Sequence, residues 1–291
     1  MRFASLSLFI VIVTGCTASP EDDESHVLDD TLDDTRSDAP PRGEVVPLVL
    51  DHAAIVGTAD HPNAVVYVPD GYDPSHPAAI VFLHGFYNCA SNVVKSANSS
   101  CGAGVRNAYH LAAQLDAAQK NALIIVPELA YDRASSDPGA LPEAGTFAAM
   151  LDDVALALAT PLPEYTIVAS HSGGYRAAAA IARDARVDEL WLLDSLYGET
   201  STFDAYLQSR PARFANIYTT GGGTLANSQA QVTRARSWVD ASQITDDRGK
   251  KVLDDDDFAR ELVFKQSGLS HDDVPRYYFN RLVATSGLAD R

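Results

Sequence analysis

The stretch Val168-Ala-Ser-His-Ser-Gly-Gly-Tyr-Arg-Ala177 marks the point where an apolar run gives way to an alanine-rich segment, with small residues around Ser172. The run before it is typical of a buried strand, whereas Ala177–Ala180 favours a helix. A serine that projects from a sharp strand-to-helix turn needs small residues two positions before and after it, here Ser170 and Gly174. The pattern therefore predicts a nucleophile elbow with Ser172 at its tip, although serine replaces the usual first glycine. A glycine-rich structural turn is the alternative.

The rest of the chain alternates between strand and helix patterns. Strands are predicted at 45–50, 64–68, 79–83, 122–126, 165–169, 189–193, 215–219 and 260–264, and helices at 105–119, 145–159, after the elbow to about 183, at 225–240 and at 274–285. Apolar strands that alternate with helices indicate one α/β domain with a mainly parallel sheet covered on both faces. In such sheets, ligands bind beyond the carboxyl ends of the strands.

A second strand end, Phe82-Leu-His-Gly-Phe-Tyr-Asn88, suits the stabilisation of a negatively charged oxygen. An acyl-transfer enzyme needs two N–H groups aimed at that oxygen, one after the nucleophile and one from the loop after an early strand. We expect the first from Gly173 and the second from Phe86 or Tyr87. A plain turn at the end of a strand is the alternative.

A third strand end supplies a candidate general base. His271 lies in Gly268-Leu-Ser-His-Asp-Asp-Val-Pro275, between the last predicted strand and the last helix. A serine hydroxyl needs a base within hydrogen-bond reach, and histidine titrates in the useful pH range. The alternative is that the segment only starts a helix capped by Asp273. His171 is next to the elbow tip and is interpreted as local support.

The base needs a carboxylate to orient its ring. Asp194 ends the strand after the elbow helix, the next predicted strand ends without a carboxylate, and Glu199 is the reserve candidate. The order Ser172, Asp194, His271 is that of α/β-hydrolases, and it differs from the orders in chymotrypsin and subtilisin.

From Val45 onward, the chain resembles the α/β-hydrolase superfamily. The segment VVYVPDGYDPSHPAAIVFLHGFYNC, residues 65–89, is similar to the first part of secreted bacterial esterases, including polyhydroxybutyrate-depolymerase-like and feruloyl-esterase-like members. The resemblance implies an α/β-hydrolase fold and a serine hydrolase, without fixing the substrate. In that superfamily the acid more often follows the strand after the one that carries Asp194, which leaves the assignment of the acid open.

The surroundings of the site are predicted to be open. The interval between Leu193 and Ala215 holds only a short helix where many superfamily members carry a lid. We expect Tyr131 and Tyr197, with Phe86 and Tyr87, to line a shallow site for small or polymeric esters, unless they serve ordinary packing. The turn 221–224 precedes a helix, where it either binds an anion or is capped by Thr224.

The N-terminus carries an export signal. Arg2 precedes the apolar run Leu6–Val13, which is too short to span a membrane, and Val13-Thr-Gly-Cys16 resembles the lipobox of bacterial lipoproteins. That resemblance implies lipidation of Cys16 and a place in the bacterial cell envelope, whereas an ordinary secretory signal would release the protein. We expect a signal peptide at 1–16, a disordered acidic tether at 17–43 and a catalytic domain at 44–291.

The charge and the remaining cysteines agree with an exported protein. A net charge of −17 argues against nucleic-acid binding, because phosphates would be repelled. Cys89 and Cys101 lie in one predicted loop, and in an exported protein we expect a disulfide between them in preference to two free thiols.

Together these patterns predict an exported, lipid-anchored serine hydrolase that cleaves carboxylic esters and needs no metal or cofactor, with the lipid as its only membrane contact. Activity should fall below roughly pH 6 to 7, where histidine takes up a proton. The alternatives are an amidase or peptidase with the same residues, and an inactive hydrolase fold that serves as a surface binding lipoprotein.

Overall fold

The computed structural model describes residues 40–51, 63–209, 213–249 and 252–291. Cys16, the predicted signal peptide and residues 17–39 of the predicted tether lie outside the described residues. None of the helices in the described part of the chain is long and apolar enough to cross a membrane.

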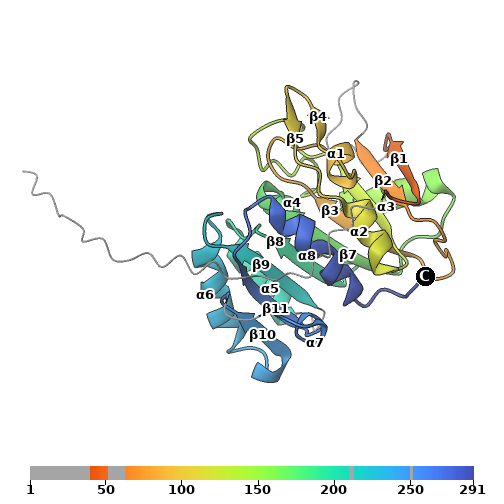
Figure 1. Ribbon diagram of the computed structural model, residues 1–291. Helices are drawn as coiled ribbons and strands as arrows, with labels where there is room; N and C mark the ends of the chain where they lie inside the picture. Colours follow the sequence, from red (N-terminus) through yellow and green to blue (C-terminus); the bar gives the residue numbers. More distant parts are fainter. Residues whose placement is uncertain (1–39, 52–62, 210–212, 250–251) are drawn as a thin grey trace, which may run out of the picture.

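A nine-stranded sheet in the order β1-β2-β6-β3-β7-β8-β9-β11-β10 forms the centre of the molecule (Figure 1). Its strands are β1 (Glu44–Leu48), β2 (Ala64–Val68), β3 (Ala78–Leu83), β6 (Leu123–Pro127), β7 (Tyr165–His171), β8 (Glu189–Leu193), β9 (Phe214–Thr219), β10 (Ile244–Asp247) and β11 (Leu262–Ser267). β2 pairs antiparallel with β1 and β6, and all other pairs are parallel. The carboxyl ends of β3, β7, β8, β9 and β11 therefore meet at one edge.

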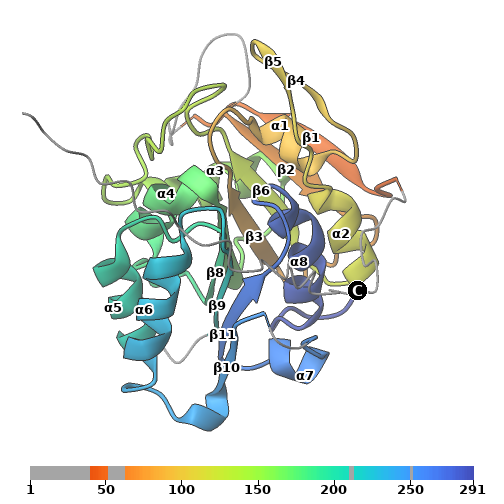
Figure 2. The same ribbon diagram turned by 60° about the vertical axis from the view of Figure 1, so that its left-hand side comes forward.

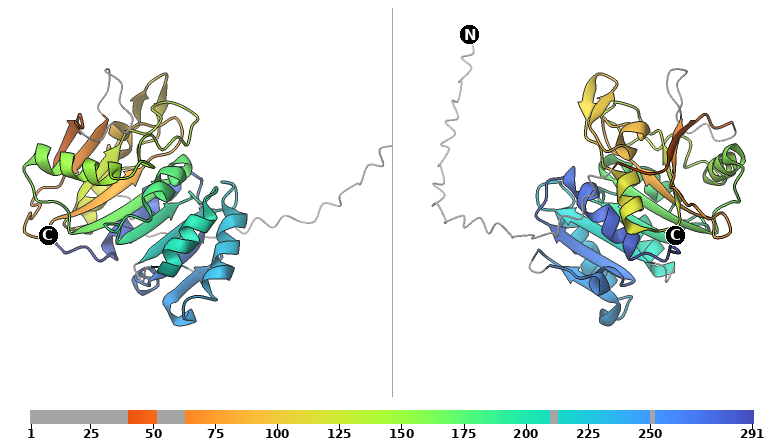
Figure 3. Two further views of the ribbon diagram at one scale, coloured as in Figure 1. Left: turned by 180° about the vertical axis from the view of Figure 1, so that it is seen from behind. Right: turned by 45° about the vertical axis from the view of Figure 1, so that its right-hand side comes forward.

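Helices cover both faces of this sheet. They are α1 (Ala90–Val94), α2 (Leu111–Ala118), α3 (Thr146–Leu158), α4 (Tyr175–Ile181), α5 (Thr200–Ser209), α6 (Leu225–Ala235), α7 (Asp255–Phe258) and α8 (Asp273–Ala284). Figure 2 shows α4, α5 and α6 on one side of the sheet and α2, α7 and α8 on the other. The view from behind in Figure 3 shows the layer of α3 to α6, in green to light blue.

Each face of the sheet has its own apolar core. Along β3, Val81 belongs to the core under α3 to α6, whereas Ile80 and Phe82 belong to the core under α1, α2, α7 and α8. All residues of β3 are buried, as expected of a parallel strand covered on both faces. The continuous apolar runs in the sequence, and the strand ends that follow them, have this physical cause.

The helix predicted at 105–119 is shorter than expected, because its first residues form a hairpin instead. β4 (Ser99–Cys101) pairs antiparallel with β5 (Gly104–Arg106), and α2 begins only at Leu111. His110 has a φ of +58°, a left-handed conformation that stops the helix from extending further back. The expected disulfide joins Cys89 to Cys101, with their Cα atoms 6.0 Å apart, and ties this hairpin to the start of α1.

Two further parts of the chain differ from the sequence-based expectation. β10 was not predicted, because its sequence Ile-Thr-Asp-Asp is half acidic; buried Asp247 is instead paired with Lys265 of β11 at 2.6 Å. The second difference is at the end of the predicted tether, where the chain contacts the domain. The backbone N–H of Arg42 donates to Asp116, and that of Gly43 donates to the Tyr67 hydroxyl.

Candidate active site

Ser172 occupies the turn between β7 and α4 with a φ of +52°, in the left-handed region that non-glycine residues rarely adopt. Such backbone strain is common at functional sites. The loop after β3 reaches this serine directly, since a Cβ on Gly85 would lie 3.1 Å from Ser172 Oγ. The ends of β3 and β7 thus meet at Ser172, as the sequence predicts.

The serine in place of the usual first glycine has a structural partner. Ser170 is fully buried, and its hydroxyl donates to Ser195 Oγ at 3.0 Å. Ser195 Oγ in turn donates to the backbone carbonyl of Ser172 at 2.9 Å. The replacement therefore adds a hydrogen-bonded chain that holds the turn at Ser172.

His271 and Asp194 form a close pair. His271 Nδ1 lies 2.6 Å from Asp194 Oδ2, and the His271 side chain is 31% exposed while that of Asp194 is 0% exposed. Glu199, the reserve candidate, is exposed on the surface. The structure thus places Asp194, at the end of β8, where a carboxylate can orient the imidazole ring.

Hydrogen bonds keep the buried Asp194 ionised. It accepts from Thr219 N at 3.0 Å, from Thr219 Oγ1 at 2.8 Å and from the Thr224 hydroxyl. Burial raises the pKa of Asp194, but the bonds from His271, Thr224 and Thr219 outweigh burial and hold the pKa below its ordinary value. A charged carboxylate beside His271 stabilises a protonated imidazole ring.

The glycine-rich turn 221–224 serves this carboxylate. Thr224 stands before α6, but its side chain makes no capping bond and donates to Asp194 instead. A Cβ on Gly222 would lie 2.1 Å from Asp194 Oδ2, so only glycine leaves room for the acid. Thr224 therefore holds the predicted N-cap position of α6, but without a side-chain capping bond, and the anion next to this turn is the side chain of Asp194. The helix cap predicted at Asp273 is wrong, because Asp273 is the first residue of α8.

Tyr197 lies beside the histidine of the pair. Burial raises the pKa of Tyr197 to about 12, so the phenol stays protonated. Its ring centroid lies 6.2 Å from that of His271. Among the described residues no hydrogen bond joins Ser172 directly to the His271 ring; such bonds often tighten only when substrate is bound. Ser172 and His271 nevertheless lie on one rim, because His171, the residue before Ser172, contacts His271 O at 3.1 Å.

The candidate oxyanion donors lie on the other side of Ser172. Gly173 is at the start of a short 3₁₀ turn, Ser172–Gly174, where the first amides have no partner within the helix. The Phe86 ring packs on Gly173, since a Cβ there would lie 2.5 Å from Phe86 Cδ1. The amide of Tyr87 donates to Arg133 O at 2.9 Å. Of the two amides expected from this loop, that of Phe86 is the better candidate.

A buried pair anchors the oxyanion loop. His84 Nε2 lies 3.0 Å from Glu128 Oε1, and the two side chains are 0% and 2% exposed. The other oxygen of Glu128 accepts from Ala90 N at 3.1 Å, which also anchors the start of α1. Sequence reasoning missed Glu128, although it lies at the end of a buried strand, where functional side chains are expected.

A pocket of about 220 Å³ borders this side of the site. Its walls include Phe86, Tyr87, the hairpin residues Val105 and Arg106, and Asp272. Tyr131 is not among the lining residues, and its hydroxyl accepts from Gly102 N in the hairpin at 2.9 Å. A larger pocket of about 630 Å³, lined by residues within 42–44, 68–74 and 158–160, contains none of the candidate site residues.

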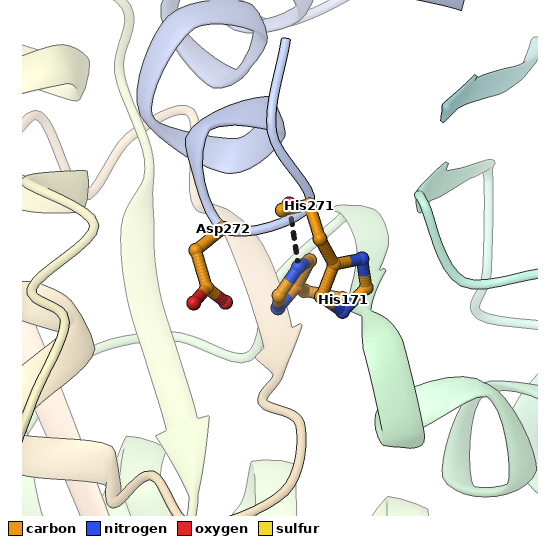
Figure 4. Close-up of side chains that lie close together, drawn as sticks. All are labelled: His171, His271 and Asp272. Carbon is orange, nitrogen blue, oxygen red and sulfur yellow. Dashed lines mark hydrogen bonds between the residues drawn. The ribbon is translucent and has the colours of Figure 1, made fainter. Parts of the chain in front are cut away.

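Three side chains that could bind a metal ion lie close together next to the site, namely His171, His271 and Asp272 (Figure 4). One possible ligand atom from each lies within 4.8 Å of the others, which is compatible with a metal ion. However, His171 Nδ1 is bonded to the Tyr109 hydroxyl at 2.9 Å and His171 Nε2 to His271 O at 3.1 Å. Because both ring nitrogens of His171 are already engaged, we interpret the cluster as a hydrogen-bond network.

Comparisons with known proteins bear on the fold. No protein-family model matches the sequence, and no curated protein matches it. Among solved structures, a thermostable esterase matches with 13% identity and a TM-score of 0.50, over 83% of this chain and 61% of that one. A predicted CIB-like hydrolase from Thermoplasma acidophilum matches with 11% identity and a TM-score of 0.47, over 83% of this chain and 97% of that one. The acylaminoacyl peptidase of Pyrococcus horikoshii matches with 11% identity and a TM-score of 0.46, over 84% of this chain and 40% of that one. With the sheet order described above, the esterase comparison identifies the fold as an α/β-hydrolase fold.

Proposed function

We propose that this chain is a serine hydrolase that cleaves carboxylic esters through an acyl-enzyme. The main support is the close pair of His271 with the buried Asp194, which lies on the same rim as a serine at a strained strand-to-helix turn. A nucleophilic serine needs both a base and a group that orients the base, and these residues meet that requirement.

In the proposed reaction, Ser172 Oγ attacks the acyl carbon as its proton passes to His271. Asp194 stabilises the imidazolium, and the amides of Gly173 and Phe86 stabilise the oxyanion. The intermediate collapses when the ester C–O bond breaks and His271 protonates the departing alcohol. Water, deprotonated by His271, then attacks the acyl group, which releases the acid and restores Ser172.

The experiment is labelling with a fluorophosphonate probe, combined with hydrolysis of nitrophenyl acetate. We expect wild type to react and Ser172→Ala to lose labelling, with a fall in kcat of at least about 10³-fold. Ser237→Ala, at an exposed serine beyond α6, is the matched control. A folded wild type that does not react would favour the inactive binding lipoprotein, and labelling that survives Ser172→Ala would move the nucleophile elsewhere. Faster cleavage of peptide anilides than of esters would favour an amidase or peptidase.

We also propose that the protein is exported and lipid-anchored through Cys16. The Cys89–Cys101 disulfide supports export, because disulfides persist in oxidising compartments. Growth of cells with a radioactive fatty acid should label wild type and leave Cys16→Ser unlabelled. An unlabelled wild type would exclude the lipid anchor and favour an ordinary secretory signal.

A further inference from the structure

We propose that His171 is a positioning residue that holds the candidate general base His271 in place, with Tyr109 fixing the orientation of its ring. This inference rests on the proposed function. It concerns a residue that the sequence indicates only as local support next to Ser172.

The contacts of His171 bear on the backbone and the ring of His271. The His171 side chain is buried, and its Nε2 lies 3.1 Å from His271 O, an atom that can only accept. His171 Nε2 must therefore carry a hydrogen. The two imidazole rings also pack together, with centroids 4.5 Å apart. His171 thus contacts His271 on its carbonyl and on its ring, while Asp194 holds Nδ1 of that ring.

Tyr109 fixes which nitrogen of His171 is protonated. In a neutral imidazole with its hydrogen on Nε2, the other nitrogen accepts a hydrogen bond. The Tyr109 hydroxyl, 2.9 Å from His171 Nδ1, supplies the donor. Its contact with Asp272 Oδ1 is longer, at 3.5 Å, and a hydroxyl has only one hydrogen to donate. The chain of donors therefore runs from Tyr109 through His171 to the backbone of His271.

The neutrality of His171 suits this role. The titratable and charged groups around it are Tyr109, before α2, Asp194, after β8, and His271 with Asp272, before α8. Burial, followed by the charge of His271, lowers the pKa of His171 to about 3. At neutral pH, His171 therefore donates a hydrogen bond without placing a second cation next to the ring that must accept a proton from Ser172.

His171 is also the residue next to the candidate nucleophile in the chain. Because His171 directly precedes Ser172, one short piece of backbone carries both the nucleophile and the group that holds its base. Any small movement of the turn carries both groups together. Small errors in the placement of reacting groups are costly, since a displacement of about 1 Å can lower a rate by about 10²-fold.

The test compares three variants in the full-length protein, with nitrophenyl acetate and the fluorophosphonate as probes. His171→Phe keeps a ring but loses the donor, and we expect kcat to fall about 10- to 100-fold with little change in KM. His171→Gln places an amide nitrogen as many bonds from Cα as Nε2, and should restore kcat to within several-fold of wild type. Tyr109→Phe, a mild change that should fold, is expected to show a smaller fall. His76→Phe, at an exposed histidine, is the control.

The pH profile separates positioning from a loss of folded protein. If the His271 ring loses its fixed orientation toward Asp194, the imidazolium is less stabilised, so the acid limb of the kcat profile should move to lower pH in His171→Phe. It should return in His171→Gln. A folded His171→Phe that reacts at the wild-type rate would overturn this inference alone. The inference would also be overturned if His171→Gln lowered kcat as much as His171→Phe does. The same holds if His171→Phe lowered kcat at every pH without moving the acid limb of the pH profile. A wild type inert to both probes would overturn the proposed function and this inference with it.

Discussion

The two sides of Ser172 are built differently. On the acid side, Asp194 is fully buried and has four hydrogen-bond donors, from His271, Thr224 and two groups of Thr219. On the oxyanion side, the Phe86 and Tyr87 side chains are 45% and 46% exposed. In the proposed enzyme, the buried acid side would set the chemistry, which tolerates little variation, whereas the open side would meet the substrate.

Of the substitutions that test this comparison, we expect the largest fall in kcat at the candidate acid, Asp194. Asp194→Asn keeps the shape of the side chain but removes the charge and leaves the imidazole in the wrong tautomer. We expect kcat to fall about 10³- to 10⁴-fold in a nitrophenyl acetate assay. Glu199→Gln, at the exposed reserve candidate, should stay within about twofold of wild type. A severe loss in Glu199→Gln with a mild one in Asp194→Asn would reverse the assignment of the acid.

A smaller effect is expected from the support of the acid. Thr224→Val keeps the volume and removes one donor to Asp194 Oδ1. We expect about a tenfold fall in kcat and a loss of about 1–3 kcal/mol in the free energy of unfolding, measured by urea denaturation. Thr233→Val removes a hydroxyl that bonds Gln229 O on the exposed side of α6, and should change neither quantity much. Equal effects of the two substitutions would show that Thr224 has no special role.

The smallest effect is expected on the open side. Tyr87→Ala leaves the backbone intact and removes an exposed ring that lies 5.0 Å from the Arg106 guanidinium. We expect KM to rise about two- to tenfold for aromatic esters with kcat nearly constant. Leu156→Ala, at another exposed apolar side chain, should leave KM unchanged. If Tyr87→Ala lowered kcat as much as Thr224→Val does, the two sides would not differ in function as proposed.

The sequence predicted the parts of the fold that depend on local patterns. β3 and β7 are continuous apolar runs because both faces of the sheet are covered, and their ends therefore mark one edge of the molecule. The α/β architecture was predicted in this way and is confirmed. The disulfide was predicted from two cysteines in one loop of a chain expected to be exported, and the structure contains it. The catalytic roles of Ser172, Asp194 and His271 stay predictions, although the structure brings these residues to one rim.

What the sequence did not predict depends on contacts between distant segments. Nothing near Thr219 or Thr224 indicates that their hydroxyls bond a carboxylate, because Asp194 lies 25 and 30 residues away. The strand β10 was missed for a similar reason, since its acidic Asp247 is buried only because Lys265 lies beside it. In each case a polar side chain is explained by a partner from another strand or turn, which periodicity cannot detect.

The serine at position 170 has a consequence for recognising related proteins. A search that requires glycine two residues before the nucleophile would pass over this chain, although Ser170 and Ser195 together hold the turn. A pattern that admits serine there, and asks for a second serine directly after the acid, would look for proteins that share this arrangement. Pairs of distant positions of this kind offer a way to find remote relatives when overall identity is too low to help.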